Sequence, residues 1–249
     1  MTKILTNHID LIVLSLTLNF FFIIFFKKIS NYYGLFDYPD YKRKIHTKPI
    51  SLLGGLIIFS NFILSIVYTL IVKNYDIIDL NLFIDTIQSF IIFLFVAILI
   101  FILGILDDKF FLDPVKKFFI LIFLITILCL NDSLTLVNVI KIPLNDSVVS
   151  FTQLSLIFSI LCYVFLIISL NMFDGINLQS FLFYIINFGF IFINTNYFSP
   201  FLLPILISLI FFGYLNYKNQ IFLGDNGTFI LAFLLGYFYV KNYNMVNIY

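Results

Sequence analysis

The residues of this sequence that could do chemistry lie in four short polar islands within a strongly apolar chain. The islands are Asp37–Pro49, Asp107–Lys117, Asn171–Asn177 and Gly224–Gly227. A charged side chain in hydrocarbon is costly and is retained only where it has a partner or a task. Counted along the chain, the islands follow the first, third, fifth and seventh apolar runs. If every run crosses a bilayer, all four islands therefore lie on the same side of it. This pattern predicts an active site at a membrane surface.

The second island begins with two adjacent carboxylates, Asp107 and Asp108, directly after an apolar run. Two carboxylates held this close can share a divalent cation, although a solvated helix end has the same composition. Lys117 opens the next apolar run, where its side chain could anchor the helix at the interface or contact a phosphate. Both alternatives stay open at these three positions.

The third and fourth islands add an amide and two further carboxylates beside glycines. Asn171 and Asp174 close a long apolar run, where an asparagine is also a common helix stop. In the fourth island Asp225 lies between Gly224 and Gly227, so backbone N–H groups stay exposed beside the carboxylate, which suits a metal-bound phosphate. The same Asp-Asn-Gly string also forms ordinary turns.

The first island concentrates cations around one histidine, with Arg43, Lys44 and His46 at its centre. Accumulation of positive charge on the cytoplasmic side explains its lysines. It does not explain His46 or the following pair Gly54-Gly55, although glycine pairs also serve helix packing. Together, hard oxygen ligands and cations favour Mg²⁺ with a phosphorylated substrate. The sequence contains no nucleophilic triad, Cys/His zinc set or Walker loop.

The composition is that of an integral membrane protein. Hydrophobic residues make up 62% of the chain and charged residues 11%, and the mean hydropathy is +1.09, which leaves too little polar surface for a soluble globule. The net charge of +1 gives no basic stripe of the kind that nucleic-acid binding requires. Cys129 and Cys162 lie within apolar runs, at a spacing that fits no metal motif.

The apolar runs predict an all-α integral membrane protein, a polytopic bundle of about eight transmembrane helices forming a single domain over residues 1–249. A bilayer's hydrocarbon, about 30 Å thick, needs roughly 20 apolar residues per helix. The runs 118–130 and 228–240 are shorter than this as strict apolar stretches. The full set is 9–26, 52–72, 87–106, 118–130, 151–170, 178–193, 197–215 and 228–240.

Lysine and arginine predict which side of the membrane the islands face, because these residues accumulate on the cytoplasmic side. Ten of the 14 lie on the island side: Lys27, Lys28, Lys42, Arg43, Lys44, Lys48, Lys109, Lys116, Lys117 and Lys218. The others are Lys3, Lys73, Lys141 and Lys241. We expect an inner (plasma) membrane protein with cytoplasmic islands and both termini outside. If 118–130 did not span, the last two islands would lie outside instead.

All four islands match, in order, motifs of the polyprenyl-phosphate N-acetylhexosaminyl-1-phosphate transferases, and the chain resembles this family of membrane enzymes over nearly its whole length. The first island, with the glycine pair, resembles the family's first cytoplasmic loop in the branch that uses UDP-N-acetylglucosamine. Asp107, Asp108 and Lys117 resemble its aspartate-pair motif. The third island resembles its Asn-x-x-Asp-Gly motif and the fourth its Gly-Asp-x-Gly motif.

The resemblance implies transfer of N-acetylhexosamine 1-phosphate, with N-acetylglucosamine the favoured sugar, from a UDP-sugar to undecaprenyl phosphate with release of UMP. This would be the first membrane step of a cell-envelope glycan of the cell-wall, O-antigen or teichoic-acid type. The implied cofactor is Mg²⁺, or Mn²⁺ in its place. The implied partners are both substrates, the lipid bilayer and a second copy of the chain in a homodimer, with no nucleic acid.

The same resemblance implies roles for residues of the islands. Asp225 and Asn171 would hold Mg²⁺ against the pyrophosphate, and Gly224 would lie beside the substrate. Asp107 and Asp108 would form the catalytic pair, in which Asp107 orients or deprotonates the lipid phosphate and Asp108 supports substrate binding. The other substrate-binding positions would be Asp174, Lys117, Arg43, Lys44 and His46, of which the last four would meet phosphate oxygens.

The chain also departs from the family pattern. Ile168 stands where the family has the first asparagine of an Asn-x-x-Asn motif, and Leu178-Gln179 follow Asn177 where the family continues with an acidic or amide residue and Gly-Leu. The sequence stops at Tyr249, before the loop whose histidine motif contacts the sugar nucleotide in the family. An inactive or split fragment acting as a membrane partner is therefore the alternative expectation. A transporter would place its ionisable groups at mid-membrane, whereas here they lie at span ends.

Overall fold

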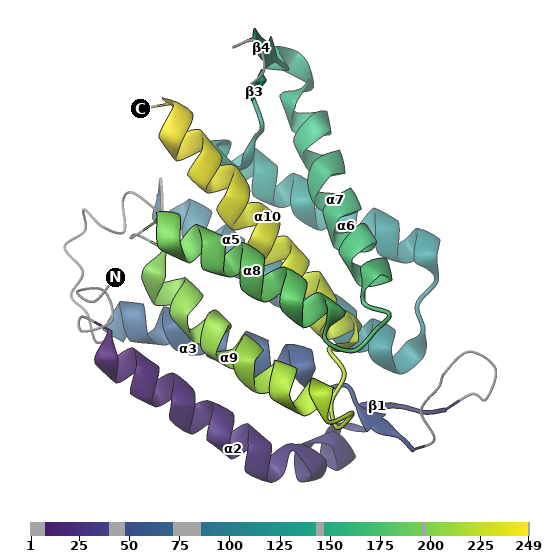
Figure 1. Cartoon of the computed structure of the whole chain (residues 1–249). Coiled ribbons are helices and arrows are strands. Elements are labelled where there is room, and N and C mark those ends of the chain that lie inside the picture. The colour runs from purple at the N-terminus through teal and green to yellow at the C-terminus, as the bar shows by residue number, and fades with distance from the viewer. Residues whose placement is uncertain (1–7, 40–47, 72–85, 143–146, 196–197, 249) are drawn as a thin grey trace.

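The structure, a computed structural model, describes residues 8–39, 48–71, 86–142, 147–195 and 198–248. Within these ranges the chain forms eight long helices packed into a bundle (Figure 1). They are α2 (Ile9–Tyr33), α3 (Gly54–Ile71), α5 (Ile87–Phe110), α6 (Pro114–Asn131), α7 (Ser155–Phe173), α8 (Gln179–Asn194), α9 (Ser199–Tyr217) and α10 (Gly224–Ile248). The predicted all-α polytopic fold is confirmed.

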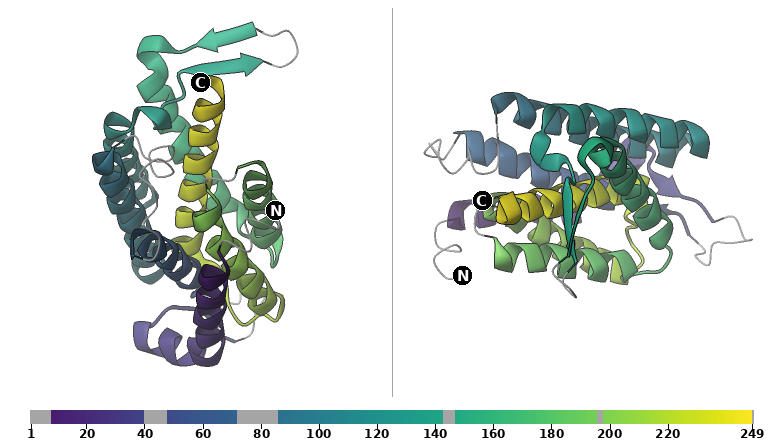
Figure 2. Two further views of the ribbon diagram at one scale, coloured as in Figure 1. Left: turned by 90° about the vertical axis from the view of Figure 1, so that its left-hand side faces the viewer. Right: turned by 90° about the horizontal axis from the view of Figure 1, so that it is seen from above.

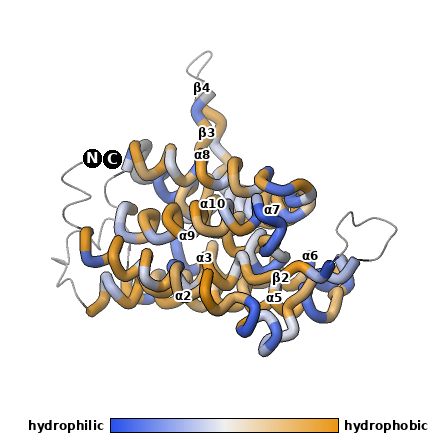
Figure 3. Tube along the Cα trace, turned by 60° about the horizontal axis from the view of Figure 1, so that its bottom comes forward, coloured by the Kyte–Doolittle hydropathy of each residue, from blue (hydrophilic) through white to orange (hydrophobic). Residues whose placement is uncertain are grey.

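Six of the described helices are long and apolar enough to cross a membrane: α2, α3, α5, α6, α7 with the turn before it, and α9. α8 is apolar but has 16 residues, and α10 does not meet this measure of length and composition. Large apolar side chains point outward from the bundle, including Ile24 at 70% and Ile186 at 66% exposure, as a lipid surrounding requires. Figure 3 shows hydrophobic residues along the helices and hydrophilic ones mainly at their ends.

α10 lies at the centre of the bundle, where α3, α5, α7 and α8 pack against it (Figures 1 and 2). Every residue from 226 to 238 is buried. At Gly236 an added Cβ would lie 3.0 Å from a methyl carbon of Leu166, so the glycine lets α7 approach closely. Because protein rather than lipid covers α10, this helix can carry glycines and polar residues.

The two short apolar runs are parts of longer helices. α6 begins at Pro114, a residue that favours the first position of a helix, and Asp113 caps it by accepting hydrogen bonds from the N–H groups of Val115 and Lys116. α10 begins at Gly224, inside the fourth island. With these polar first turns the helices reach 18 and 25 residues, so both runs form helices as predicted.

Small antiparallel hairpins, which the apolar runs do not predict, join some of the helices. β1 (Phe36–Asp37) pairs with β2 (Ile50–Ser51), and β3 (Val139–Ile142) pairs with β4 (Ser147–Ser150). The second hairpin projects from the bundle (Figure 2), between the short 3₁₀ helices η1 (Ser133–Thr135) and η2 (Thr152–Leu154). Strands this short carry too little periodicity to be recognised in a sequence.

Successive helices alternate in direction, so that one end of the bundle collects the described residues of all four islands. The ends of α5, α7 and α9 lie there beside the starts of α6, α8 and α10, together with β1 and β2 (Figure 1). We call this the motif end. The fold thus brings together side chains that are more than a hundred residues apart in sequence.

A buried polar network joins α2 to α3 between lipid-facing surfaces. The Asn61 side-chain oxygen accepts hydrogen bonds from the Ser15 hydroxyl at 2.6 Å and from the Asn19 amide at 3.0 Å. All three side chains are fully buried. Hydrogen bonds of this kind hold neighbouring helices together where no hydrophobic effect acts between them.

We expect Asn61→Leu to lower the free energy of unfolding by about 1 kcal/mol, because two donors on α2 lose their shared acceptor. Thermal unfolding in detergent measures the change. Asn194→Leu is the matched control, since the Asn194 side chain is exposed and donates to the carbonyl of Phe190 in its own helix. If both variants lost the same free energy of unfolding, the network would not stabilise the contact between α2 and α3.

Candidate active site

Asp108, at the end of α5, caps the first turn of α10. Its Oδ1 accepts a hydrogen bond from the N–H of Asp225 at 2.8 Å, and its Oδ2 accepts from the N–H of Asn226 at 3.1 Å and from the Asn226 side-chain amide. The first N–H groups of a helix have no partner within it, and a carboxylate there also meets the positive end of the helix dipole. Asp108 therefore positions the helix that carries Asp225.

Asp108→Ala is expected to lower the free energy of unfolding by about 2 kcal/mol, because two backbone donors and a side-chain amide lose their acceptor. Asp108→Asn keeps one acceptor oxygen and should lose about half as much. Thermal unfolding of both variants in detergent measures the difference. Equal losses would contradict the capping role.

Glycines allow α3 and α5 to touch the same turn of α10. Gly224 has a φ of +75°, which favours glycine, and an added Cβ would lie 2.9 Å from Asp108 Oδ2. At Gly104 of α5 an added Cβ would lie 2.4 Å from the Asn226 Cα, and at Gly55 of α3 it would lie 2.3 Å from the Gly227 nitrogen. The Gly54-Gly55 pair, left open above, therefore serves close packing.

The segment before α10 is held by the residues that follow the first island. The N–H of Phe222 donates to the carbonyl of Ser51 at 2.8 Å, and the N–H groups of Gly54 and Gly55 donate to the carbonyls of Phe222 and Leu223, each at 3.0 Å. The first island thus adjoins the fourth. Its residues Arg43, Lys44 and His46 lie outside the described residues.

Asp107, adjacent to the capping aspartate, is 2% exposed and forms an ion pair with Lys117, whose Nζ lies 2.6 Å from Asp107 Oδ2. Its other oxygen accepts a hydrogen bond from the N–H of Leu112 at 2.9 Å. The Asp225 carboxylate interacts with Asp107, Asp108 and Lys117. Carboxylates held this close repel one another, so the site favours binding of a cation.

The third island contributes Asn171 to this site and Asp174 to its edge. Asn171 Oδ1 accepts a hydrogen bond at 2.7 Å from the hydroxyl of Thr228, the fifth residue of α10. Asp174 accepts from the Ser180 hydroxyl at 2.6 Å, in the turn between α7 and α8. Burial raises the pKa of Asp174, and the Ser180 bond opposes this shift. Among the described residues, no hydrogen bond or ion pair joins Asp174 to the Asp107–Asp225 cluster.

An apolar pocket of about 460 Å³ opens beside this cluster, between α6 and α7, with Phe229 of α10 contributing to its wall. Its polar lining residues are Lys117 and Asn171, both predicted site residues. The remaining lining residues are Pro114, Val115, Phe118, Leu121, Ile168, Met172 and Phe229. The pocket therefore suits an apolar chain that ends in an anion.

Sequence reasoning missed the apolar wall of this pocket, because its residues have the composition of any membrane span. Pro114, Lys117, Phe118 and Leu121 recur at intervals of three, one and three residues, which places them on one face of α6. This spacing next to a motif lysine is the signal that could have found them. Ile168, noted above as a departure from the family pattern, lies in the same wall.

The donors at this site fit Mg²⁺ only in part. No group of three or more His, Cys, Asp or Glu side chains that could hold a metal lies within the described ranges. Magnesium commonly takes one or two carboxylates, and substrate phosphates and water complete its shell. Asp225 and Asp107 can supply those carboxylates. The Asn171 oxygen accepts a hydrogen bond from Thr228, which leaves it one lone pair for the implied role as a ligand.

Comparison with known proteins assigns this part of the chain to a family. The sequence model of glycosyl transferase family 4 matches residues 90–242, more than half of the chain. This range runs from α5 into α10 and contains the second, third and fourth islands. No curated protein matches the chain. The chain belongs to glycosyl transferase family 4, whose membrane-integral members transfer a sugar phosphate from a nucleotide sugar to polyprenyl phosphate.

Proposed function

We propose that this protein transfers N-acetylhexosamine 1-phosphate, with N-acetylglucosamine the favoured sugar, from a UDP-sugar to undecaprenyl phosphate and releases UMP. The observation that carries the proposal is the apolar pocket that opens beside the carboxylate cluster, with Lys117 and Asn171 as its polar lining residues. A lipid phosphate has the matching chemistry, an apolar chain that ends in a dianion.

The acceptor lipid would lie with its prenyl chain between α6 and α7. There it would contact Phe118, Leu121 and Phe229, and Ile168 would extend the apolar wall. Its phosphate would meet the Lys117 ammonium group, which lines the pocket and pairs with Asp107. The apolar contacts would supply affinity, while the lysine would set the position of the phosphate.

In the reaction an oxygen of the lipid phosphate attacks the phosphorus that bears the sugar. A new P–O bond forms, the P–O bond to UMP breaks, and UMP leaves with the bonding electron pair. A phosphate monoester has a second pKa of about 6, so the acceptor is mostly ionised at neutral pH. Asp107 then has little need to remove a proton, and its ion pair with Lys117 favours an orienting role.

Positioning and charge neutralisation supply most of the catalysis in phosphoryl transfer. Mg²⁺, held by Asp225 and Asp107, would neutralise the pyrophosphate charge and polarise the bond to the leaving group. Asp108 keeps Asp225 in place by capping α10. We further propose that the motif end faces the cytoplasm of a plasma membrane, because most lysines and arginines lie on that side.

The test is UMP release by the full chain, purified in detergent, with UDP-N-acetylglucosamine, undecaprenyl phosphate and Mg²⁺. We expect release that stops with EDTA and returns with excess Mg²⁺. UDP-N-acetylgalactosamine and UDP-glucose in parallel define the sugar. Omission of the lipid phosphate separates transfer from hydrolysis. Release that is independent of the lipid, or no release with any of these sugars, would refute the proposal.

A further inference from the structure

A second buried ion pair lies at the end of the bundle opposite the motif end. Lys241 Nζ of α10 lies 2.9 Å from Oδ2 of Asp132, the residue that ends α6, and both side chains are fully buried. The sequence places Lys241 among the charges of the opposite face, but the structure encloses it in protein. Replacing a buried ion pair by apolar residues often costs no stability, so stability alone does not account for this pair.

The neighbours of this pair join α6, η1 and α10 tightly. The hydroxyl of Tyr237 donates to Asp132 Oδ2 at 3.4 Å, and Lys241 Nζ lies 5.2 Å from the Tyr237 ring centroid. The Asn244 amide donates to the carbonyls of Leu134 and Leu136 at 2.7 and 2.9 Å. The far end of α10 is therefore fixed to the end of α6 by side chains from three turns of helix.

The same two helices carry charges at the motif end, in the opposite order. α6 has Lys117 near its start and Asp132 at its end, whereas α10 has Asp225 near its start and Lys241 near its end. Separations of 15 and 16 residues correspond to about 22 and 24 Å along a helix. The two separations thus match. At one end Lys117 pairs with Asp107, and its charge also acts on the Asp225 carboxylate; at the other end Asp132 pairs with Lys241.

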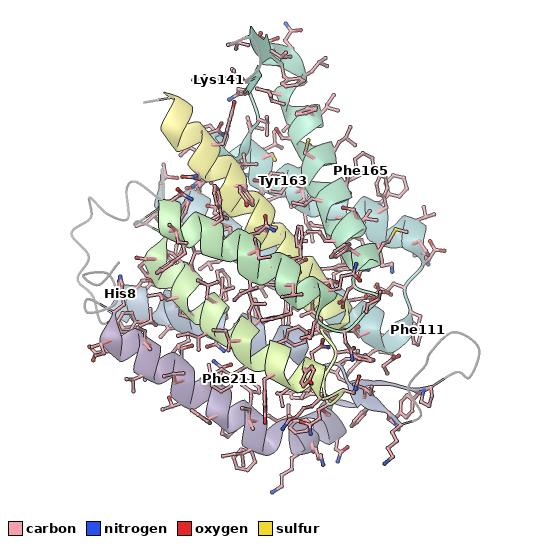
Figure 4. All side chains as sticks on the ribbon, in the orientation of Figure 1. His8, Phe111, Lys141, Tyr163, Phe165 and Phe211 are labelled. Atoms are coloured by element: carbon pink, nitrogen blue, oxygen red, sulfur yellow. The ribbon has the colours of Figure 1, made fainter. Side chains whose placement is uncertain are left out.

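Between these two ends, other groups separate α6 from α10. The pocket has walls from α6 and α7 and reaches Phe229 of α10. α7 also packs on α10, where the ring of Tyr163 would lie 3.1 Å from a Cβ added at Gly236. Figure 4 labels Tyr163 on the side of α7 nearer to α10 and Phe165 on its outer side. The Asp132–Lys241 ion pair holds the end of α6 directly to α10.

We propose that Asp132 and Lys241 are positioning residues for the transfer reaction, an inference that rests on the proposed function. Their ion pair fixes the axial register of α10 against α6, and so it sets the distance from Asp225 to Lys117 and the width of the pocket. A helix moves as a rigid rod, so a slip at one end appears at the other. A misplacement of about 1 Å at reacting groups can reduce a rate about a hundredfold.

The first experiment compares UMP release by three variants of the full chain. Asp132→Asn combined with Lys241→Met removes both charges while the side-chain sizes stay similar. We expect kcat to fall about tenfold or more, with thermal unfolding close to that of Asn61→Leu, the control that loosens α2 and α3 instead. Lys241→Met alone leaves Asp132 uncompensated, and we expect it to unfold at a lower temperature than the double variant. Wild-type kcat in the folded double variant would overturn the proposal.

The second experiment measures the axial register of α10 against α6 and does not depend on enzyme activity. Spin labels at Lys116→Cys on α6 and Gln220→Cys before α10, both exposed positions, are placed in a Cys129→Ala, Cys162→Ala background. We expect one narrow distance distribution in the parent and a broader or shifted one after Asp132→Asn with Lys241→Met. An unchanged distribution refutes the register role, whether or not the parent is active. A shifted distribution in a parent that releases no UMP supports the register role and refutes the proposed function separately.

Discussion

Asp225→Asn is expected to reduce UMP release by about a hundredfold or more. The substitution removes one of the carboxylates available to Mg²⁺ but leaves the first turn of α10 in place, because Asp108 bonds to backbone N–H groups there. The loss should therefore arise in metal binding and chemistry rather than in folding. Initial rates over a range of Mg²⁺ concentrations measure it, and we expect the half-saturating concentration to rise.

Asp113→Asn is the matched control for this change. Asp113 also lies at the motif end, but its side chain caps α6 from an exposed position, and asparagine is an equally good cap. We expect its rate and its Mg²⁺ dependence to equal those of the parent. An Asp225→Asn variant with the parent's Mg²⁺ dependence would exclude Asp225 as a metal ligand.

Lys117→Met is expected to reduce UMP release by a similar factor, about a hundredfold. Lys117 is the described cation in the pocket lining, so its loss would leave the acceptor phosphate without a counter-charge and the buried Asp107 without its partner. The rate as a function of undecaprenyl phosphate concentration measures the effect. We expect KM for this lipid to rise as well as kcat to fall.

Two further variants separate these causes. Lys116→Met removes an exposed neighbouring charge on the same helix and should leave the rate unchanged. Lys117→Met combined with Asp107→Asn removes the uncompensated carboxylate, so it should regain thermal stability. Its activity should stay low, because Asp107 is itself proposed to hold Mg²⁺. If the double variant also regained activity, Lys117 would act by neutralising Asp107 and not by meeting the phosphate.

The sequence predicts the helices well because membrane spans need long apolar runs, which are a local property. Even the short runs 118–130 and 228–240 are helical in the structure, as α6 and α10. Their polar first turns could be added from local signals, such as the Asp113-Pro114 start of α6. The β3–β4 hairpin could not be found in this way, since four residues per strand give too short a pattern.

The sequence predicts that the island residues share one end of the bundle, but it does not predict their contacts. Asp107, Lys117, Asn171 and Asp225 do lie together at one end of the bundle. The capping of α10 by Asp108 could not be foreseen, because it joins residues from two helices far apart in sequence. Nothing local to either residue marks that contact.

The second ion pair was missed for a related reason. Asp132 and Lys241 each lie near the end of an apolar run, where a charged residue ordinarily meets water. In the structure η1 packs against α10 at this place, and both side chains are fully buried. A sequence can thus place a charge at the end of a span without indicating whether solvent or another helix receives it.

The central place of α10 also bears on the order in which the protein assembles. α10 follows the other seven described helices in sequence, yet it fills the space among α3, α5, α7 and α8. During synthesis those helices enter the membrane first and must remain loosely associated until α10 inserts between them. Asp108 and Asn171 bond to residues of α10 and reach these contacts only at that step, so this part of the site assembles after the helices that carry it.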